Sequence, residues 1–242
     1  LAAQIFTEMQ YYFPNNEVQY FVSYYDFYQP EAYLPSSDTF IEKDASINEQ
    51  IEQMRLAATK SILERKDVII VSSVSAIYGL GDPSSYKEMR LTLEIGQHIK
   101  LQNILHQLTV LQYSRNDYNF TRGTFRARGD VIDIFPAESN NTAIRICLFG
   151  DEIESLSYFS PINQKNISTL ASITIYPRNH FVTPKEKLQS AVITIRDELE
   201  KQLLIYEKNN LHLEAQRLKQ RTEYDLEMME HLGFCNGIEN YS

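Results

Sequence analysis

The sequence has few cysteines, no long apolar run and no excess of basic residues. Its 242 residues include only Cys147 and Cys235, far apart, so we expect neither a disulfide framework nor a zinc cluster, and a reducing cytoplasm is indicated. No apolar run approaches the roughly 18–20 residues that span a bilayer, and no signal peptide is visible. Lys and Arg number 23 against 32 Asp and Glu, and the net charge of −9 excludes a protein that coats nucleic acid by charge alone. Any nucleic-acid contact must be local.

Motifs for catalysis and metal binding are also missing. No glycine precedes a lysine, so the chain has no phosphate-binding loop for a triphosphate. The acidic pair Asp151-Glu152 follows an apolar run, but the preceding Gly150 and the alternation after it favour a hairpin turn over an ATPase motif. Gly79-Leu80-Gly81 is an isolated pair of glycines that indicates a turn from a strand to a helix. The five histidines show no metal-ligand spacing, so we expect no catalytic residue and no metal site in this chain.

The most informative feature present is an aromatic stretch over residues 20–33. Seven of its fourteen residues are aromatic, and they occupy both faces of an extended chain. One interpretation is a central strand buried on both sides. The other is a partly exposed aromatic ribbon, favoured by its many tyrosines and by the interruptions at Pro30 and Pro35. Exposed flat rings suit contact with nucleobases.

The first third of the chain has the alternation of a parallel α/β fold. A helical pattern runs to Phe13, and residues 17–23 follow as a strand. Ser46 and Glu49 have the spacing of a capping box, which predicts a helix before the apolar strand of residues 67–74. Strand, helix and buried strand in this order predict a parallel sheet. The expected buried face of the helix comprises Ile47, Ile51, Met54, Ala58 and Ile62.

The pattern changes near Leu91 and again after Pro184. A short helix from Leu91 to about His106 is expected before an antiparallel α+β module. After Pro184 the chain is strongly helical to about Leu232, with a first apolar stripe at Leu188, Val192, Ile195, Leu199 and Leu203. The strands expected in the module are residues 123–128, 131–135, 143–149, 153–159 and 173–176.

Both ends look cut. Residues 1–6 already lie inside a helical pattern without an N-cap, and residues 237–242 resolve no element. We therefore expect a fragment of a longer protein.

Several of these segments together resemble one known family. Tyr24-Tyr25-Asp26-Phe27-Tyr28-Gln29-Pro30-Glu31-Ala32-Tyr33, with residues 35–48, is similar to the aromatic β-hairpin of the UvrB family, the damage-verifying subunits of bacterial nucleotide excision repair. The arginine–glycine module also resembles a domain of the transcription-repair coupling factor, but the hairpin favours UvrB. The resemblance covers essentially the whole chain, continuing through residues 73–83, 122–131, 149–154 and 228–241.

The resemblance implies a fold and a function. The fold would be α/β, a partial RecA-like parallel sheet of helicase superfamily 2 with an inserted β-hairpin and a separate α+β docking domain. The protein would be cytoplasmic, belong to the SOS response, dock on UvrA, insert its hairpin between the strands of damaged DNA and prepare the site for UvrC. ATP and Mg²⁺ would serve the complete protein, with the phosphate-binding loop before residue 1 and the acidic motif after Ser242, so this chain alone would be inactive. The implied parts are residues 1–23 and 49–88 (first lobe), 24–48 (hairpin), 89–182 (UvrA-interaction domain) and 183–242 (start of a helical subdomain).

The resemblance also assigns site residues. Within residues 24–48 five acids outnumber the single base Lys43, so stacking rather than phosphate attraction would hold DNA, and Lys43 would lock the hairpin. Phe27 stands where the family usually has tyrosine, and Cys147 where it often has an acid. The expected DNA contacts are Tyr24, Tyr25, Phe27, Tyr28, Glu31, Tyr33 and Phe40; the expected UvrA contacts are Arg115, Arg126, Arg128 and Arg145.

Two alternatives stay open. The arginines could simply pair with surface acids, namely Asp117, Asp130 and Asp133. The whole chain could also be a protein-interaction module whose aromatic ribbon is a buried strand. Solvent access to the hairpin rings would separate this interpretation from a DNA-repair subunit.

Overall fold

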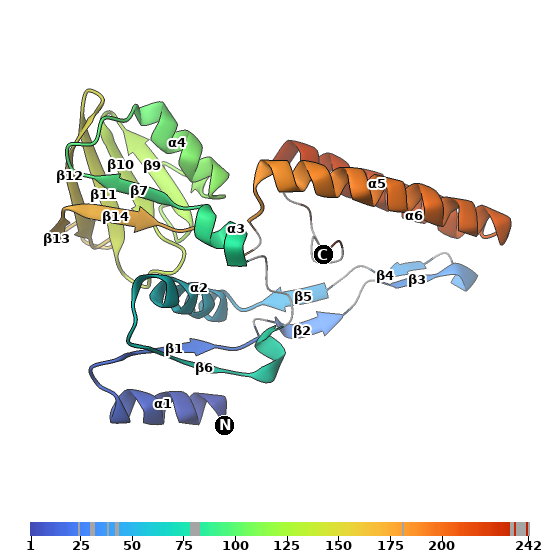
Figure 1. Cartoon of the computed structure of the whole chain (residues 1–242), viewed down its shortest axis with the longest axis horizontal. Coiled ribbons are helices and arrows are strands. Elements are labelled where there is room, and N and C mark those ends of the chain that lie inside the picture. The colour runs from blue at the N-terminus through green and yellow to red at the C-terminus, as the bar shows by residue number, and fades with distance from the viewer. Residues whose placement is uncertain are drawn as a thin grey trace. The chain divides into compact units, whose positions relative to one another are not determined.

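The computed structural model describes residues 1–23, 25–29, 32–37, 39–41, 44–77, 83–180, 182–232, 235 and 241. These residues form a mixed α/β structure with six α-helices and several small sheets (Figure 1). The chain divides into two compact units, Leu1–Tyr24 with Ile47–Val182, and Tyr25–Ser46 with Thr183–Ser242. Each unit is described by itself.

The N-terminal part of the first unit contains a parallel pair of strands. Strand β1 (Glu17–Phe21) pairs in parallel with β6 (Val68–Ser72), with Gln19 opposite Ile70. Helix α1 (Ala2–Tyr12) precedes β1, and α2 (Glu49–Glu64) precedes β6. The parallel pairing predicted from the alternation is confirmed, while the assignment of these strands to a RecA-like lobe remains a prediction.

The N-terminus of α2 differs from the expected capping box. Asn48 is the N-cap: its Oδ1 accepts hydrogen bonds from the backbone N–H groups of Gln50 and Ile51, both at 3.1 Å. Ser46 lies in strand β5 (Asp44–Ile47), so it cannot cap the helix. The prediction was wrong by two residues because an Asn caps as well as a Ser, and pairing of the preceding strand decides where the helix can begin.

The buried face of α2 also differs from the predicted stripe. Arg55, Leu56 and Ala58 are the buried residues, whereas Ile62 is 56% exposed. Leu56 packs with Tyr86, Tyr176 and Val182, and Lys60 forms an ion pair with Glu138 at 3.0 Å. The helix thus contacts residues on more than one side, which a single periodic stripe does not describe.

The rest of the first unit is built on a six-stranded sheet in the order β13-β12-β11-β10-β9-β8, of which Figure 1 labels β9 to β13. The pairs from β9 to β13 are antiparallel, and β8 joins β9 in parallel. Its inner face packs with α4 (Leu101–Val110) and a second antiparallel pair, β7 (Leu91–Glu94) with β14 (Ser172–Ile175), in one large apolar core. The strands are β8 (Ser114–Arg115), β9 (Thr124–Arg128), β10 (Val131–Phe135), β11 (Ala143–Phe149), β12 (Glu152–Phe159) and β13 (Asn166–Leu170).

All five predicted strands of this module are confirmed to within a residue or two. The turn at Gly150 is confirmed as well: it has φ of +62° and joins β11 to β12. The helix expected from Leu91 was wrong at its start, because Leu91 and Leu93 alternate as the buried residues of β7 and the helix begins only at Leu101. The sequence pattern did not predict β8, because it has only two residues, or β13, because its residues are mostly polar and exposed.

The second unit has short strands and two long helices. Strand β2 (Tyr25–Gln29) neighbours β5, and β3 (Ala32–Leu34) pairs antiparallel with β4 (Thr39–Ile41), with the turn Pro35–Ser37 between them. Helices α5 (Lys185–Lys208) and α6 (His212–Leu232) pack together around Leu188, Val192, Leu226 and Met229. The predicted helical stretch is confirmed, with a break at residues 209–211. The short α3 (Pro83–Glu88) belongs to the first unit.

Candidate docking site

Three of the predicted arginines, Arg126, Arg128 and Arg145, lie on the outer face of the six-stranded sheet, and Arg115 lies in its edge strand β8. In the register of β9, β10 and β11, Asp133 stands opposite Arg126 on one side and Arg145 on the other. The neighbouring Ile132, Ile134, Ile144 and Ile146 point to the opposite face and are buried in the core. Alternation therefore places these three charged side chains together on the face away from the core.

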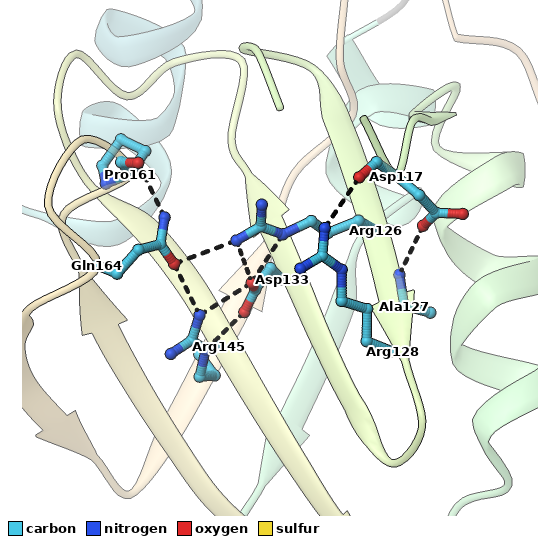
Figure 2. A network of polar contacts seen from close by, with 8 residues as sticks. All are labelled: Asp117, Arg126, Ala127, Arg128, Asp133, Arg145, Pro161 and Gln164. Atoms are coloured by element: carbon cyan, nitrogen blue, oxygen red, sulfur yellow. Dashed lines mark hydrogen bonds and ion pairs between the residues drawn. The ribbon is translucent and has the colours of Figure 1, made fainter. Parts of the chain in front are cut away.

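The carboxylate of Asp133 binds both guanidinium groups (Figure 2). Oδ2 accepts from Arg126 Nε at 2.9 Å and Nη2 at 2.7 Å, and Oδ1 accepts from Arg145 Nε at 2.7 Å. Gln164 Oε1 accepts from Nη2 of both arginines at 3.1 Å, while its own amide donates to the carbonyl of Pro161. Asp133 is only 5% exposed, so this is a half-buried network rather than a loose surface contact.

Aromatic rings lie beneath the two guanidinium groups. Arg126 Cζ is 4.4 Å from the ring centroid of Phe120, and Arg145 Cζ is 4.3 Å from that of Phe159. The two rings stack on each other with centroids 6.2 Å apart. Each guanidinium is thus fixed by a carboxylate, an amide and a π-face, so its orientation is set before any partner binds.

Arg128 and Arg115 extend this surface along the edge of β9. Arg128 Nη2 donates to the backbone carbonyl of Asp117 at 3.2 Å, and Arg115 Nε donates to the Asp117 carboxylate at 3.1 Å. The same carboxylate accepts from the backbone N–H of Ala127. Arg126 and Arg128 lie two residues apart in β9 and so share a face, as predicted from the sequence.

We refer to these six residues, Arg115, Arg126, Arg128, Arg145, Asp117 and Asp133, as the arginine surface. Arg115, Arg126 and Arg145 pair with the two carboxylates. With Arg128, four positive and two negative side chains give the arginine surface a net charge of about +2 in a protein whose formal charge is −9. Hydrogen bonding to Asp133 raises the pKa of Arg145 above its usual range. The Arg145 guanidinium is therefore charged at any physiological pH.

The alternative that the arginines pair with nearby acids is also correct in part. Asp117 and Asp133 do pair with them. Pairing and docking are compatible here, because Asp133 fixes two guanidinium groups without covering their outer edges. Arg145 remains 30% exposed and Arg126 13% exposed, whereas Arg128 is well exposed.

Three members of this network carry no recognisable signal in the sequence. Gln164 has a left-handed backbone with φ of +60° in the loop between β12 and β13, and it reaches both arginines from there. Phe120 and Phe159 were apolar residues without an assigned role. Only the strand register together with the path of the loops brings these residues to the arginines.

The predicted hairpin residues are described only in part. Tyr24, Glu31 and Lys43 lie outside the described residues. Tyr25, Phe27, Tyr28, Tyr33 and Phe40 lie on strands β2, β3 and β4, but their side chains lie outside the description. Their roles, and the test by solvent access, stay predictions.

Within the described ranges, no group of three or more His, Cys, Asp or Glu side chains could hold a metal ion. Of the described helices, none combines the length and apolar character that crossing a membrane requires.

Comparison with known proteins gives the same assignment along the whole chain. The family model of the UvrB interaction domain matches residues 91–181, and that of the UvrB third helical domain matches residues 186–242. The chain is similar to proteins named UvrABC system protein B: 60% identical to that of Citrobacter koseri, 61% to that of Pasteurella multocida and 60% to that of Shigella flexneri. Each comparison covers 100% of this chain and 36% of the relative, so the chain spans about a third of these relatives.

Proposed function

The chain belongs to the UvrB family over its whole length, and we propose that it serves the recognition and verification of DNA damage in bacterial nucleotide excision repair. In this proposal the interaction domain docks on UvrA through the arginine surface. The hairpin of residues 24–48 then inserts between the DNA strands, and UvrC incises the prepared site. The observation that carries the docking step is the shared carboxylate of Asp133, which holds Arg126 and Arg145 in one fixed row.

Electrostatic attraction explains how such a surface would find its partner. Two excess positive charges attract an acidic patch on a partner, whereas two copies of a protein of net charge −9 repel each other overall. Fixed guanidinium groups lose little conformational freedom on binding, and their planar edges suit carboxylates. We therefore infer that UvrA presents acidic side chains to the arginine surface.

The DNA step rests on the composition of the hairpin. Residues 24–48 contain five acids and one base, so attraction to phosphate would be weak and stacking would provide the affinity, at roughly 1–3 kcal/mol per base. An undamaged duplex would resist insertion because opening it costs stacking energy. Selectivity for damaged DNA follows from this balance.

In this proposal the N-terminal part of the first unit would belong to the motor. The parallel pair β1 and β6, with α2 before β6, supports a RecA-like lobe. The sequence holds no phosphate-binding loop, so ATP and Mg²⁺ would bind residues that a longer protein supplies. The identity with proteins named UvrABC system protein B supports this assignment over a transcription-repair coupling factor.

The docking step is tested with two exposed arginines. Arg126→Glu would place a carboxylate against the buried Asp133 and destabilise the domain, so the test uses Arg115→Glu with Arg128→Glu. We expect this pair to weaken UvrA binding at least tenfold in a titration, most strongly at low salt. Arg196→Glu with Lys201→Glu on α5 changes the net charge equally and serves as the control. Equal affinity of both double variants for UvrA would refute docking through the arginine surface.

The hairpin step is tested in a full-length protein that carries this segment. Phe27→Ala with Tyr28→Ala should abolish stable complexes on damaged DNA after UvrA loading, while UvrA binding survives. Tyr11→Ala with Tyr12→Ala, two exposed rings on α1, is the matched control. Normal retention and incision of lesions by the hairpin variant would mean that its rings only pack inside the protein.

A further inference from the structure

The outer face of β11 continues past the arginines into an apolar end. Arg145, Cys147 and Phe149 alternate along this strand, so all three side chains lie on the face away from the core. The intervening Ile146 and Leu148 are buried, as is Ile144 before Arg145. Exposure rises along the strand, from 30% at the Arg145 side chain, through the half-buried Cys147, to 79% at Phe149.

The neighbours of Cys147 connect this end to the arginine surface. In the sheet register Cys147 stands opposite Val131, which in turn stands opposite Arg128. Arg128, Val131 and Cys147 therefore form one row next to the row of Arg126, Asp133 and Arg145. Phe149 lies one step further along, beside the turn at Gly150.

Because Phe149 is 79% exposed, its ring contributes little apolar burial to the stability of the domain. Covering Phe149 with a partner would remove its apolar surface from water and stabilise the complex by about 25 cal/mol per Å². Arginine and aromatic residues are also the types enriched in protein interfaces. The charge of the neighbouring arginine surface determines which kind of partner can cover Phe149. A net positive patch favours an acidic partner and disfavours a second copy of the same patch.

We propose that the docking surface extends along β11 through Cys147 to Phe149, and that the acidic partner docked on the arginine surface covers Phe149 with an apolar recess. This extension rests on the proposed docking function. The arginines would set the rate of encounter and its dependence on salt, whereas Phe149 would set how long the complex lasts. The two contributions can therefore be measured separately.

The first experiment compares three variants of the chain in binding kinetics with UvrA. Phe149→Ala should weaken binding about tenfold through faster dissociation, with an unchanged salt dependence of association. Arg115→Glu with Arg128→Glu should slow association and flatten its salt dependence. Tyr224→Ala, another exposed aromatic but on α6, should bind like the unaltered chain.

The second experiment needs no substitution, because Cys147 reports on its own surroundings. Cys235 is fully buried, and burial raises the pKa of its thiol to about 12, so a maleimide reagent should label Cys147 alone in the folded chain. Saturating UvrA should slow this labelling at least tenfold. Labelling beforehand should weaken binding, since the added group would occupy the same surface.

The outcomes separate the extension from the docking function. If the arginine variant loses affinity while Phe149→Ala binds within twofold of the unaltered chain and Cys147 is labelled equally fast in the complex, docking stands and the extension is wrong. If the arginine variant keeps full affinity, both are wrong. Self-association of the unaltered chain that Phe149→Ala abolishes would overturn the extension in favour of a second copy as the occupant.

Discussion

Removing the carboxylate of Asp133 should destabilise the interaction domain strongly. Asp133→Ala deletes an acceptor that is 5% exposed and leaves Arg126 and Arg145 side by side without it. Loss of one partner of a buried ion pair costs about 3–5 kcal/mol. Water can reach Arg145, which is 30% exposed, so part of that cost is recovered. We therefore expect a loss of about 2–4 kcal/mol in the free energy of unfolding.

The measurement is urea unfolding followed by far-ultraviolet circular dichroism, with Glu223→Ala as the control. Glu223 pairs with Lys219 at 3.9 Å on the surface of α6, where both side chains are 57% exposed, so its removal should cost under about 0.5 kcal/mol. The loss in free energy of unfolding caused by Asp133→Ala should persist at a salt concentration of about 0.5 M, because salt screens buried ion pairs only weakly. A loss no larger than that of the control would mean that the shared carboxylate does not hold the arginine surface together.

Three further predictions concern the cap, a buried histidine and nucleotide binding. Asn48→Ala should cost about 1 kcal/mol in urea unfolding because two N–H groups of α2 lose their acceptor, and Asn48→Asp should retain the stability; equal stability of all three proteins would contradict the cap. Burial lowers the pKa of His180 to about 4, and its ring nitrogen lies 2.8 Å from Thr59 Oγ1. In the unfolded chain His180 binds a proton near pH 6.5. The contribution of the neutral, buried His180 to the free energy of unfolding is therefore fully present above that pH and is lost as the pH falls toward 4, by up to about 3 kcal/mol. His180→Gln should flatten the fall in stability between about pH 7 and 5, and an unchanged slope would show that His180 does not cause it. Finally, an ATP analogue should show no saturable binding to the chain at millimolar concentration, because the sequence supplies no phosphate-binding loop; a saturable isotherm would disprove this.

Local sequence patterns predicted most of the secondary structure. The strands from β9 to β12 follow from alternation of apolar and polar residues, and the turn at Gly150 follows from its backbone freedom. The predictions that failed lie where contacts between distant segments compete with local signals. Leu91 and Leu93 fit a helix start as well as a strand until pairing with β14 is known, and Ser46 fits a cap until pairing of β5 removes it.

The sequence by itself determined that this chain holds a parallel α/β element, an antiparallel module, long C-terminal helices and no nucleotide loop, because these depend on residue type and short spacing. Only the tertiary structure decided that Arg126, Asp133, Arg145 and Gln164 form one network. These residues are separated by 7 to 38 positions along the chain, and strand register and loop path bring them together. Register is fixed by burial of the opposite face of the sheet, so the placement of the charged row is a consequence of how the apolar core packs.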